Sequence, residues 1–289
     1  MTVFNCCPRG GSEDARAVSP GMSRVVTPTP ALLEQYERDG VLVLPDVLAA
    51  DEVAVLRRGV ERVFAVHSPD ADLYPKEFHM QEIWRPKMFE HGAEFEALVD
   101  HPGIAQLVDA ILGDDCHLIA NSAMRTPPGK TLSTWHSDEG VRFPRPPDVP
   151  LDRRHPMPTF VLNIHYYLGD VDEALGPTQF VPGSHRSGRG PEPADLDATG
   201  NPSYEGRGVL SAVGPAGTCV MWNDQTWHRG GPNTSGNRIR WAIQTPFARR
   251  WIAQRFHPYV NYRFPEEILA RANPRRRRLF GVHAVGSYG

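Results

Sequence analysis

The sequence is poor in cysteine, has no long apolar run and carries no excess of one charge. Its four cysteines are scattered, with Cys6 and Cys7 in the N-terminal stretch and Cys116 and Cys219 far from them. This distribution excludes a disulfide framework or a CxxC zinc site and favours a reducing, cytoplasmic setting. No stretch approaches the ~18 consecutive apolar residues of a membrane span, and no basic region followed by an apolar core indicates a signal peptide. Lys and Arg number 31 against 34 Asp and Glu. We therefore expect neither membrane nor nucleic-acid partners.

Proline and glycine, by contrast, are abundant, with 28 and 26 residues in a chain of 289. This content favours many turns and loops and excludes a helical bundle. Residues 1–30 are rich in Gly, Pro, Ser and Thr without periodicity, which predicts a flexible N-terminal tail. We expect residues 31–289 to form a single domain, because folds of this length with many short strands are often undivided.

The pattern of elements changes near residue 116. Before it, the sequence predicts a helix over 31–38, a strand over 41–45, a long helix capped by Asp51 and a helical stretch over about 95–112. After it, short strand-like runs alternate with Gly/Pro-rich loops, at 117–123, 131–135, 159–168, 178–181, 217–222 and 238–245. The sequence therefore predicts a mainly β fold with flanking helices and an antiparallel sandwich or jelly-roll core over about 116–247.

Two long loops interrupt the predicted strands. The loop 139–158 contains six prolines and several basic residues, among them Arg142, Arg145, Arg153 and Arg154, and the loop 186–208 is polar and rich in Gly and Pro. Loops longer than ~12–15 residues in a compact domain are usually lids or binding loops. We expect both loops to form a mobile lid that orders when substrate binds. The run Arg275–Arg278 is interpreted as a solvated face rather than a nucleic-acid signal.

One short pattern predicts a metal site. His136 and Asp138 are two residues apart, so in a strand both side chains point to the same face. His228, between a buried-looking strand and a Gly-rich turn, is the candidate third ligand. Two His and one carboxylate form the facial triad of non-haem iron(II) oxygenases, which leaves positions for a 2-oxo acid and dioxygen. The alternative is a chance His-x-Asp pair among twelve histidines.

A pair of arginines could anchor the 2-oxo acid. Arg238 and Arg240 share one face of the predicted strand 238–245, which follows His228. Arg binds carboxylates bidentately, and an Arg buried inside a barrel needs an anionic partner. We expect one of them to bind the distal carboxylate of 2-oxoglutarate. The alternative for each is a solvated arginine on the outer face.

In these features the chain resembles the phytanoyl-CoA dioxygenase family of iron(II)/2-oxoglutarate oxygenases over about residues 31–283. The resemblance rests on five segments in this order: Tyr36–Pro45, Leu48…Glu52-Val53, Trp135–Asp138, Gly176-Pro177…Val181–His185, and His228…Gly231–Ser235 followed by Arg. It implies a double-stranded β-helix with helices packed outside. It also implies that His136, Asp138 and His228 bind iron and that the following arginine binds 2-oxoglutarate.

The chain departs from the family pattern in two places. Neither arginine lies at the usual spacing after His228, and the pattern Arg-x-Ala/Gly fits Arg240-Trp241-Ala242, so Arg240 is preferred and Arg238 is the alternate. Leu175 stands where the family usually has Asn. His165, on one face of its predicted strand with Asn163 and Tyr167, is interpreted as a barrel histidine rather than a cosubstrate residue. His185 is interpreted as a rim or structural residue.

The resemblance implies an enzyme that uses iron(II), 2-oxoglutarate and O2 to hydroxylate or otherwise oxidise a C–H bond of a small molecule, in secondary or small-metabolite metabolism. Asp138 disfavours halogenation, because related halogenases leave that position to chloride. Two alternatives remain: a catalytically silent metal-binding protein of the same fold, and a cupin-type metal-dependent hydrolase or isomerase. We expect a monomer or small homo-oligomer.

Overall fold

The computed structural model describes residues 23–131, 133–138, 146, 149, 152, 156–256, 259–260 and 262–284. The four arginines of the predicted lid loop 139–158 lie outside the described residues, so that expectation stays untested. None of the described helices is long and apolar enough to cross a membrane. The cytoplasmic location and the oligomeric state remain predictions.

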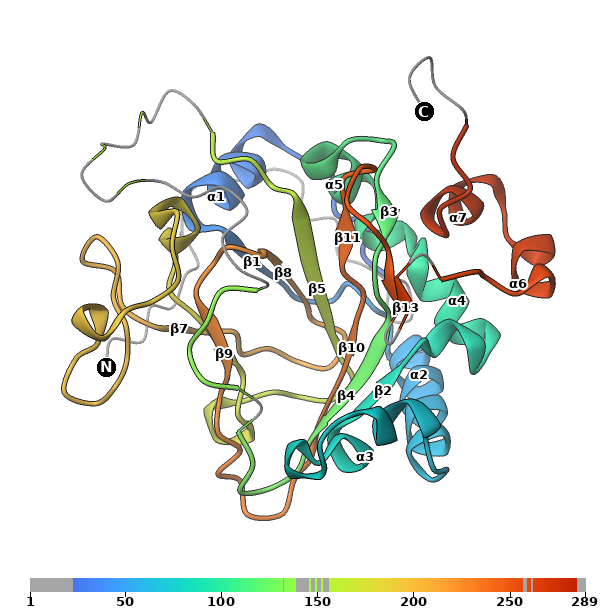
Figure 1. Cartoon of the computed structure of the whole chain (residues 1–289), viewed down its shortest axis with the longest axis horizontal. Helices are drawn as coiled ribbons and strands as arrows, with labels where there is room; N and C mark the ends of the chain where they lie inside the picture. Colours follow the sequence, from blue (N-terminus) through green and yellow to red (C-terminus); the bar gives the residue numbers. More distant parts are fainter. Residues whose placement is uncertain are drawn as a thin grey trace.

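Two antiparallel sheets form the centre of the molecule (Figure 1). The larger sheet has the strand order β1-β8-β5-β10-β4-β2, with β11 and β3 attached beside β5. Its strands are β1 (Val41–Leu44), β2 (Trp84–Pro86), β3 (His117–Leu118), β4 (Ser122–Thr126), β5 (Val161–Tyr167), β8 (Cys219–Asn223), β10 (Arg240–Gln244) and β11 (Phe247–Ala248). The smaller sheet is β7-β6-β9, formed by β6 (Thr178–Phe180), β7 (Leu210–Ser211) and β9 (His228–Gly230). A separate hairpin joins β12 (Arg255–Phe256) and β13 (Tyr259–Val260).

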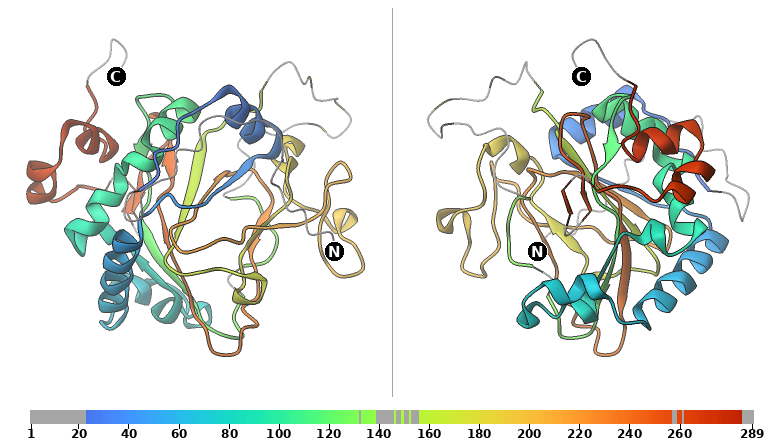
Figure 2. Two further views of the ribbon diagram at one scale, coloured as in Figure 1. Left: turned by 180° about the vertical axis from the view of Figure 1, so that it is seen from behind. Right: turned by 45° about the vertical axis from the view of Figure 1, so that its right-hand side comes forward.

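The helices pack mainly against the outer face of the larger sheet (Figures 1 and 2). They are α1 (Pro30–Asp39), α2 (Ala50–Phe64), α3 (Met80–Ile83), α4 (Ala93–Val99), α5 (Pro102–Leu112), α6 (Glu266–Arg271) and α7 (Pro274–Leu279). Strand β5 is buried along its whole length because both of its faces are covered. Its residues Leu162, Ile164 and Tyr166 face the helices, whereas Tyr167 joins a second apolar cluster with Phe180 and Trp222 between the sheets. The predicted mainly β fold with flanking helices is confirmed.

Several predicted element boundaries were wrong. The stretch 95–112 is two helices, because Pro102 begins α5 with His101 as its cap. Helix α2 begins at Ala50 rather than being capped by Asp51; the Glu52 side chain accepts the N–H of Ala49 at 2.8 Å. The stretch 117–123 contributes to two strands, β3 and β4. The sheet also extends beyond the predicted core 116–247, since β1 and β2 pair with β8 and β4.

The four arginines Arg275–Arg278 are more than a solvated face. Arg275 lies 2.5 Å from Asp109, and Arg276 lies 2.7 Å from Asp100, so α7 is ion-paired to α5 and to the end of α4. Arg277 donates to the carbonyl of Leu269, and Arg278 to that of Cys116. The run therefore attaches the C-terminal helices to the body of the domain.

The loop 186–208 is also more ordered than predicted. It contains the 3-10 helices η5 (Ser184–Ser187) and η6 (Pro193–Asp195). Arg189 binds both carboxylate oxygens of Asp195 at 2.6 and 2.8 Å, and Asp195 also accepts the N–H of Glu192. The hydrogen bonds from Arg189 lower the pKa of Asp195. These contacts hold part of the loop together, and its role as a lid remains a prediction.

The Asp195→Asn variant should therefore loosen this loop. We expect a loss of about 1 kcal/mol in the free energy of unfolding at pH 7, because the pair is charge-assisted but partly exposed. The pKa of Asp195 is lowered in the folded state, so its contribution is present above the unfolded pKa of about 3.9 and is lost as the pH falls through the folded pKa. Urea unfolding and amide hydrogen exchange over 186–208 measure both effects. Glu192→Gln is the control, because Glu192 is exposed and lies 4.0 Å from Arg189, and its free energy of unfolding should stay close to that of wild type. Equal losses in the two variants would contradict the stabilising role of the Arg189–Asp195 pair.

Candidate metal centre

The structure brings His136, Asp138 and His228 together. One potential ligand atom from each lies within 4.8 Å of the others, and this is the only such group of three or more among the described residues. The Nε2 atoms of His136 and His228 are each 3.6 Å from an oxygen of Asp138, one from Oδ1 and one from Oδ2. The pair His136 and Asp138 and the sequence-distant His228 thus converge on one small volume.

Backbone pairing, rather than a regular strand, positions this group. The described residues of the segment 131–135 do not form the predicted strand; His136 makes an isolated antiparallel bridge to His228 at the start of β9. Their backbones exchange two hydrogen bonds, of 3.0 and 2.8 Å, and the N–H of Asp138 then donates to the carbonyl of Asp224. The two histidines therefore lie opposite each other, with ring centroids 4.3 Å apart.

The hydrogen bonds of the two imidazole rings determine which nitrogen faces the centre. Nδ1 of His136 lies 2.7 Å from the carbonyl oxygen of Thr134, and Nδ1 of His228 lies 2.8 Å from that of Thr226. A carbonyl can only accept, so each Nδ1 carries the proton and each Nε2 of the neutral ring presents a lone pair. Lone pairs from two imidazoles and a carboxylate then converge without a donor between them. This donor set fits a divalent cation such as iron(II).

Strand β5 supports the group from the neighbouring sheet. Asn163 donates from Nδ2 to Oδ2 of Asp138 at 2.7 Å, which orients the carboxylate. His165, the next residue on the same face, is buried, and neither ring nitrogen has a hydrogen-bond partner among the residues that the structure describes. Burial, with the positive charge of Arg240, lowers the pKa of His165 to about 3, so it is neutral. The alternation along β5 predicted this shared face; the hydrogen bond to Asp138 depends on packing between sheets and was missed.

Electrostatics keep Asp138 ionised. Burial alone would raise its pKa, but His228 and His136 in their protonated forms, together with the amide of Asn163, lower it overall. Burial lowers the pKa of His228. For His136, burial acts downward, but the nearby carboxylate of Asp138 and the hydrogen bond to the carbonyl of Thr134 raise the pKa overall. An aromatic wall completes the environment, since Phe180 stacks against His228 with centroids 6.0 Å apart and Trp222 lies 5.4 Å from it.

The structure separates the two candidate arginines. Arg240 begins β10 and is 2% exposed. Its guanidinium donates to the carbonyl of Gly176 and, at 3.1 Å, to Oγ1 of Thr126. Burial lowers its pKa. Arg238 lies before the strand, with 44% of its side chain exposed, and forms a two-bond ion pair with Asp172 at 2.8 and 2.9 Å. The predicted strand 238–245 was too long at its start, so only Arg240 points into the interior.

Comparisons with known proteins identify the family of the chain. Residues 36–242 match the family described as Phytanoyl-CoA dioxygenase (PhyH). The ectoine dioxygenase of Stutzerimonas stutzeri is 26% identical, over 76% of this chain and 80% of that protein. The L-proline trans-4-hydroxylase of Streptomyces griseoviridis is 24% identical, over 71% of this chain and 81% of that protein.

Solved structures show the same fold. HygX from Streptomyces hygroscopicus, solved with nickel and 2-oxoglutarate bound, superposes with a TM-score of 0.60 at 15% identity. The match covers 79% of this chain and 90% of HygX. The family match spans well over half of the chain and includes all three converging residues and Arg240. The chain therefore belongs to the phytanoyl-CoA dioxygenase family of iron(II)- and 2-oxoglutarate-dependent dioxygenases.

Proposed function

We propose that His136, Asp138 and His228 hold the iron, that Arg240 binds the distal carboxylate of 2-oxoglutarate, and that the enzyme hydroxylates a C–H bond of a small polar molecule. The observation that supports this most strongly is the convergence of three ligand atoms within 4.8 Å, together with a buried arginine on the inner face of the same barrel. When bound, iron(II) with 2-oxoglutarate and dioxygen supplies oxidative decarboxylation coupled to substrate oxidation. The residues described below determine where the reactants lie.

The inner face of β5 connects the two ends of the proposed cosubstrate site. Asn163 contacts Asp138. Tyr167, four residues along, lies near Arg240: burial raises the pKa of Tyr167, and the nearby guanidinium acts against that rise. At ~3.3 Å per residue these two positions are ~13 Å apart, with His165 between them. A 2-oxoglutarate molecule would lie along this row. Because His165 is neutral, the positive charge that would bind the distal carboxylate in this row comes from Arg240.

The guanidinium of Arg240 is oriented before any ligand arrives. Gly176 and Thr126 accept two of its five N–H donors, and no carboxylate pairs with it among the described residues. Burying an arginine without a counter-ion is costly, and a bound carboxylate would offset that cost. The site is therefore arranged to gain from binding a dianion such as 2-oxoglutarate.

The relatives support a small-molecule substrate. One is named for ectoine, one for L-proline, and a third is the dioxygenase FrzG of Cladobotryum, 23% identical over 79% of this chain. We place the enzyme in small-metabolite or secondary metabolism. We also propose that residues 31–289 act as one domain and that the loops beside Asp138 and His185 contribute to substrate selection.

A substrate-screened assay tests this function. Purified enzyme is incubated with iron(II), ascorbate and 2-oxoglutarate, and succinate is measured with and without each member of a panel that includes ectoine, L-proline and an acyl-CoA. We expect iron-dependent succinate formation that a small polar metabolite stimulates. Absence of succinate under every condition would indicate a catalytically silent protein. If a substrate is converted at a rate that does not depend on 2-oxoglutarate, the protein is a hydrolase or isomerase.

A further inference from the structure

Two turns within the segments that carry the family resemblance have no part in the proposed chemistry. One contains Gly40, which ends α1, and the other contains Ser184 and His185. Both contact the short segment that leads into His228. The carbonyl of Gly40 accepts the N–H of Asn223 and Oγ1 of Thr226, each at 2.9 Å. These segments therefore determine where the backbone before His228 lies.

The hydroxyl of Ser184 completes the pairing between β6 and the residue before His228. In register, Phe180 opposes His228, so Val181 opposes Trp227. The N–H of Val181 donates to the carbonyl of Trp227 at 2.9 Å. The reciprocal bond is relayed: the N–H of Trp227 donates to Oγ of Ser184 at 2.8 Å, and that hydroxyl donates to the carbonyl of Val181 at 2.6 Å. Ser184 is fully buried, so no water replaces this link.

Trp227 is held on its other side as well. Its indole is fully buried, and Nε1 donates to the carbonyl of Arg189 at 2.8 Å. The guanidinium of Arg189 lies 5.0 Å from the ring centroid, and Tyr204 packs edge-on against the same ring. The residue adjacent to His228 is thus fixed through both its backbone and its side chain.

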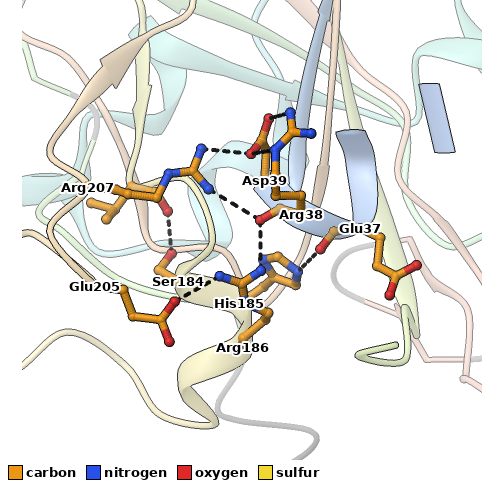
Figure 3. A network of polar contacts seen from close by, with 9 residues as sticks. Glu37, Arg38, Asp39, Ser184, His185, Arg186, Glu205 and Arg207 are labelled. Atoms are coloured by element: carbon orange, nitrogen blue, oxygen red, sulfur yellow. Dashed lines mark hydrogen bonds and ion pairs between the residues drawn. The ribbon is translucent and has the colours of Figure 1, made fainter. Parts of the chain in front are cut away.

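The end of α1 keeps Ser184 in place (Figure 3). The carbonyl of Asp39 accepts the N–H of Gly183, and that of Glu37 accepts Nε2 of His185 at 3.0 Å. Gly40 has φ +69, and a Cβ there would lie 2.3 Å from Nδ1 of His185. Only glycine allows α1 to end this close to the Ser184 segment.

We propose that Ser184 is a positioning residue that, through the backbone N–H of Trp227, holds His228 with its Nε2 aimed at Asp138. The ring of His228 is oriented by the carbonyl of Thr226, so any displacement of residues 226–228 moves Nε2 relative to His136 and Asp138. The inference rests on the proposed role of His228 as a metal ligand. It assigns the hydroxyl of Ser184 to the geometry of the metal centre.

Cobalt(II) binding to the chelator-treated apoprotein tests the proposal without substrate. The affinity and the visible absorption of bound cobalt are measured for wild type, Ser184→Ala and His228→Ala. The matched control is Thr218→Val: Thr218 is fully buried and, like Ser184, donates its hydroxyl to the carbonyl three residues earlier, that of Pro215, but it accepts nothing from the His228 segment. Thermal unfolding of each apoprotein reports the general cost of losing a buried hydroxyl.

We expect Ser184→Ala to weaken cobalt binding about tenfold and to alter the absorption spectrum, whereas Thr218→Val stays within about twofold of wild type. Both variants should unfold at a lower temperature. Cobalt binding by Ser184→Ala that matches Thr218→Val in affinity and spectrum would overturn the positioning role. If His228→Ala binds cobalt as wild type does, the ligand assignment itself fails, which is a distinct result. Should Ser184→Ala not fold, Ser184→Cys, of similar volume and weaker accepting power, is measured with the same criteria.

Discussion

Substitution of Asp138 by alanine should reduce substrate oxidation to less than about 1% of the wild-type rate, a loss of ~2.7 kcal/mol or more in transition-state stabilisation. The carboxylate lies between two imidazole Nε2 atoms at 3.6 Å from each, so its removal leaves two neutral ligands and no compensating charge. The amide of Asn163 also loses its acceptor. Oxygen uptake with 2-oxoglutarate and metal analysis of the purified variant measure the effect.

The chain contains a matched control for this substitution. Asp72 also accepts from a side-chain amide, that of Gln81, and lies 2.7 Å from His67, but on the surface. Asp72→Ala should retain wild-type activity and metal content. Full activity and full iron content in Asp138→Ala would remove Asp138 from the proposed iron site.

Arg240→Leu should raise the KM for 2-oxoglutarate at least tenfold, equivalent to about 1.4 kcal/mol, because a charge-assisted carboxylate pair in a buried site is lost. The guanidinium is buried and oriented by Gly176 and Thr126, so no solvent-exposed arginine can take its place. Arg240→Lys keeps the charge without the planar fork and should give an intermediate KM. Succinate formation at varied 2-oxoglutarate concentration gives the values.

Arg238→Leu is the control in this case. Its guanidinium is half-exposed and already paired with Asp172, so the KM for 2-oxoglutarate should change less than about twofold. If Arg238→Leu raised the KM more than Arg240→Leu, the cosubstrate anchor would have to be reassigned to Arg238.

The sequence predicted which residues converge better than it predicted the backbone contacts that bring them together. The two-residue spacing of His136 and Asp138 correctly grouped them, but the reason offered, a regular strand over 131–135, was wrong. Their convergence comes from the bridge between His136 and His228, a contact across 92 positions that local patterns cannot indicate. Likewise, Asn163 was placed on the correct face of β5, but its bond to Asp138 depends on how two sheets pack.

The local errors have local physical causes. Pro102 divides the stretch 95–112 because a proline is tolerated in the first turn of a helix but not in its interior, and the prediction of one helical stretch did not use this signal. Arg238 and Arg240 share a face in any strand that contains both, and only the start of β10 at Arg240, with Asp172 nearby, separates an exposed arginine from a buried one. The loop 186–208 was predicted to be a mobile lid from its polar, Gly- and Pro-rich composition, and composition does not indicate the ion pair between Arg189 and Asp195.

The position of β1 affects how the chain can fold during synthesis. Val41 pairs with Trp222 and Leu44 with Cys219. The first strand of the larger sheet therefore cannot pair with β8 until about 180 further residues have been synthesised. At ~5–20 residues per second, the ribosome delivers that partner ~10–40 s after β1 emerges. During this time β1, with its apolar sequence Val-Leu-Val-Leu, has an unpaired edge, and pairings of such long range are slow to form. Production at lower temperature or with a chaperone that binds extended apolar segments should therefore increase the folded yield more than stabilising the finished barrel would.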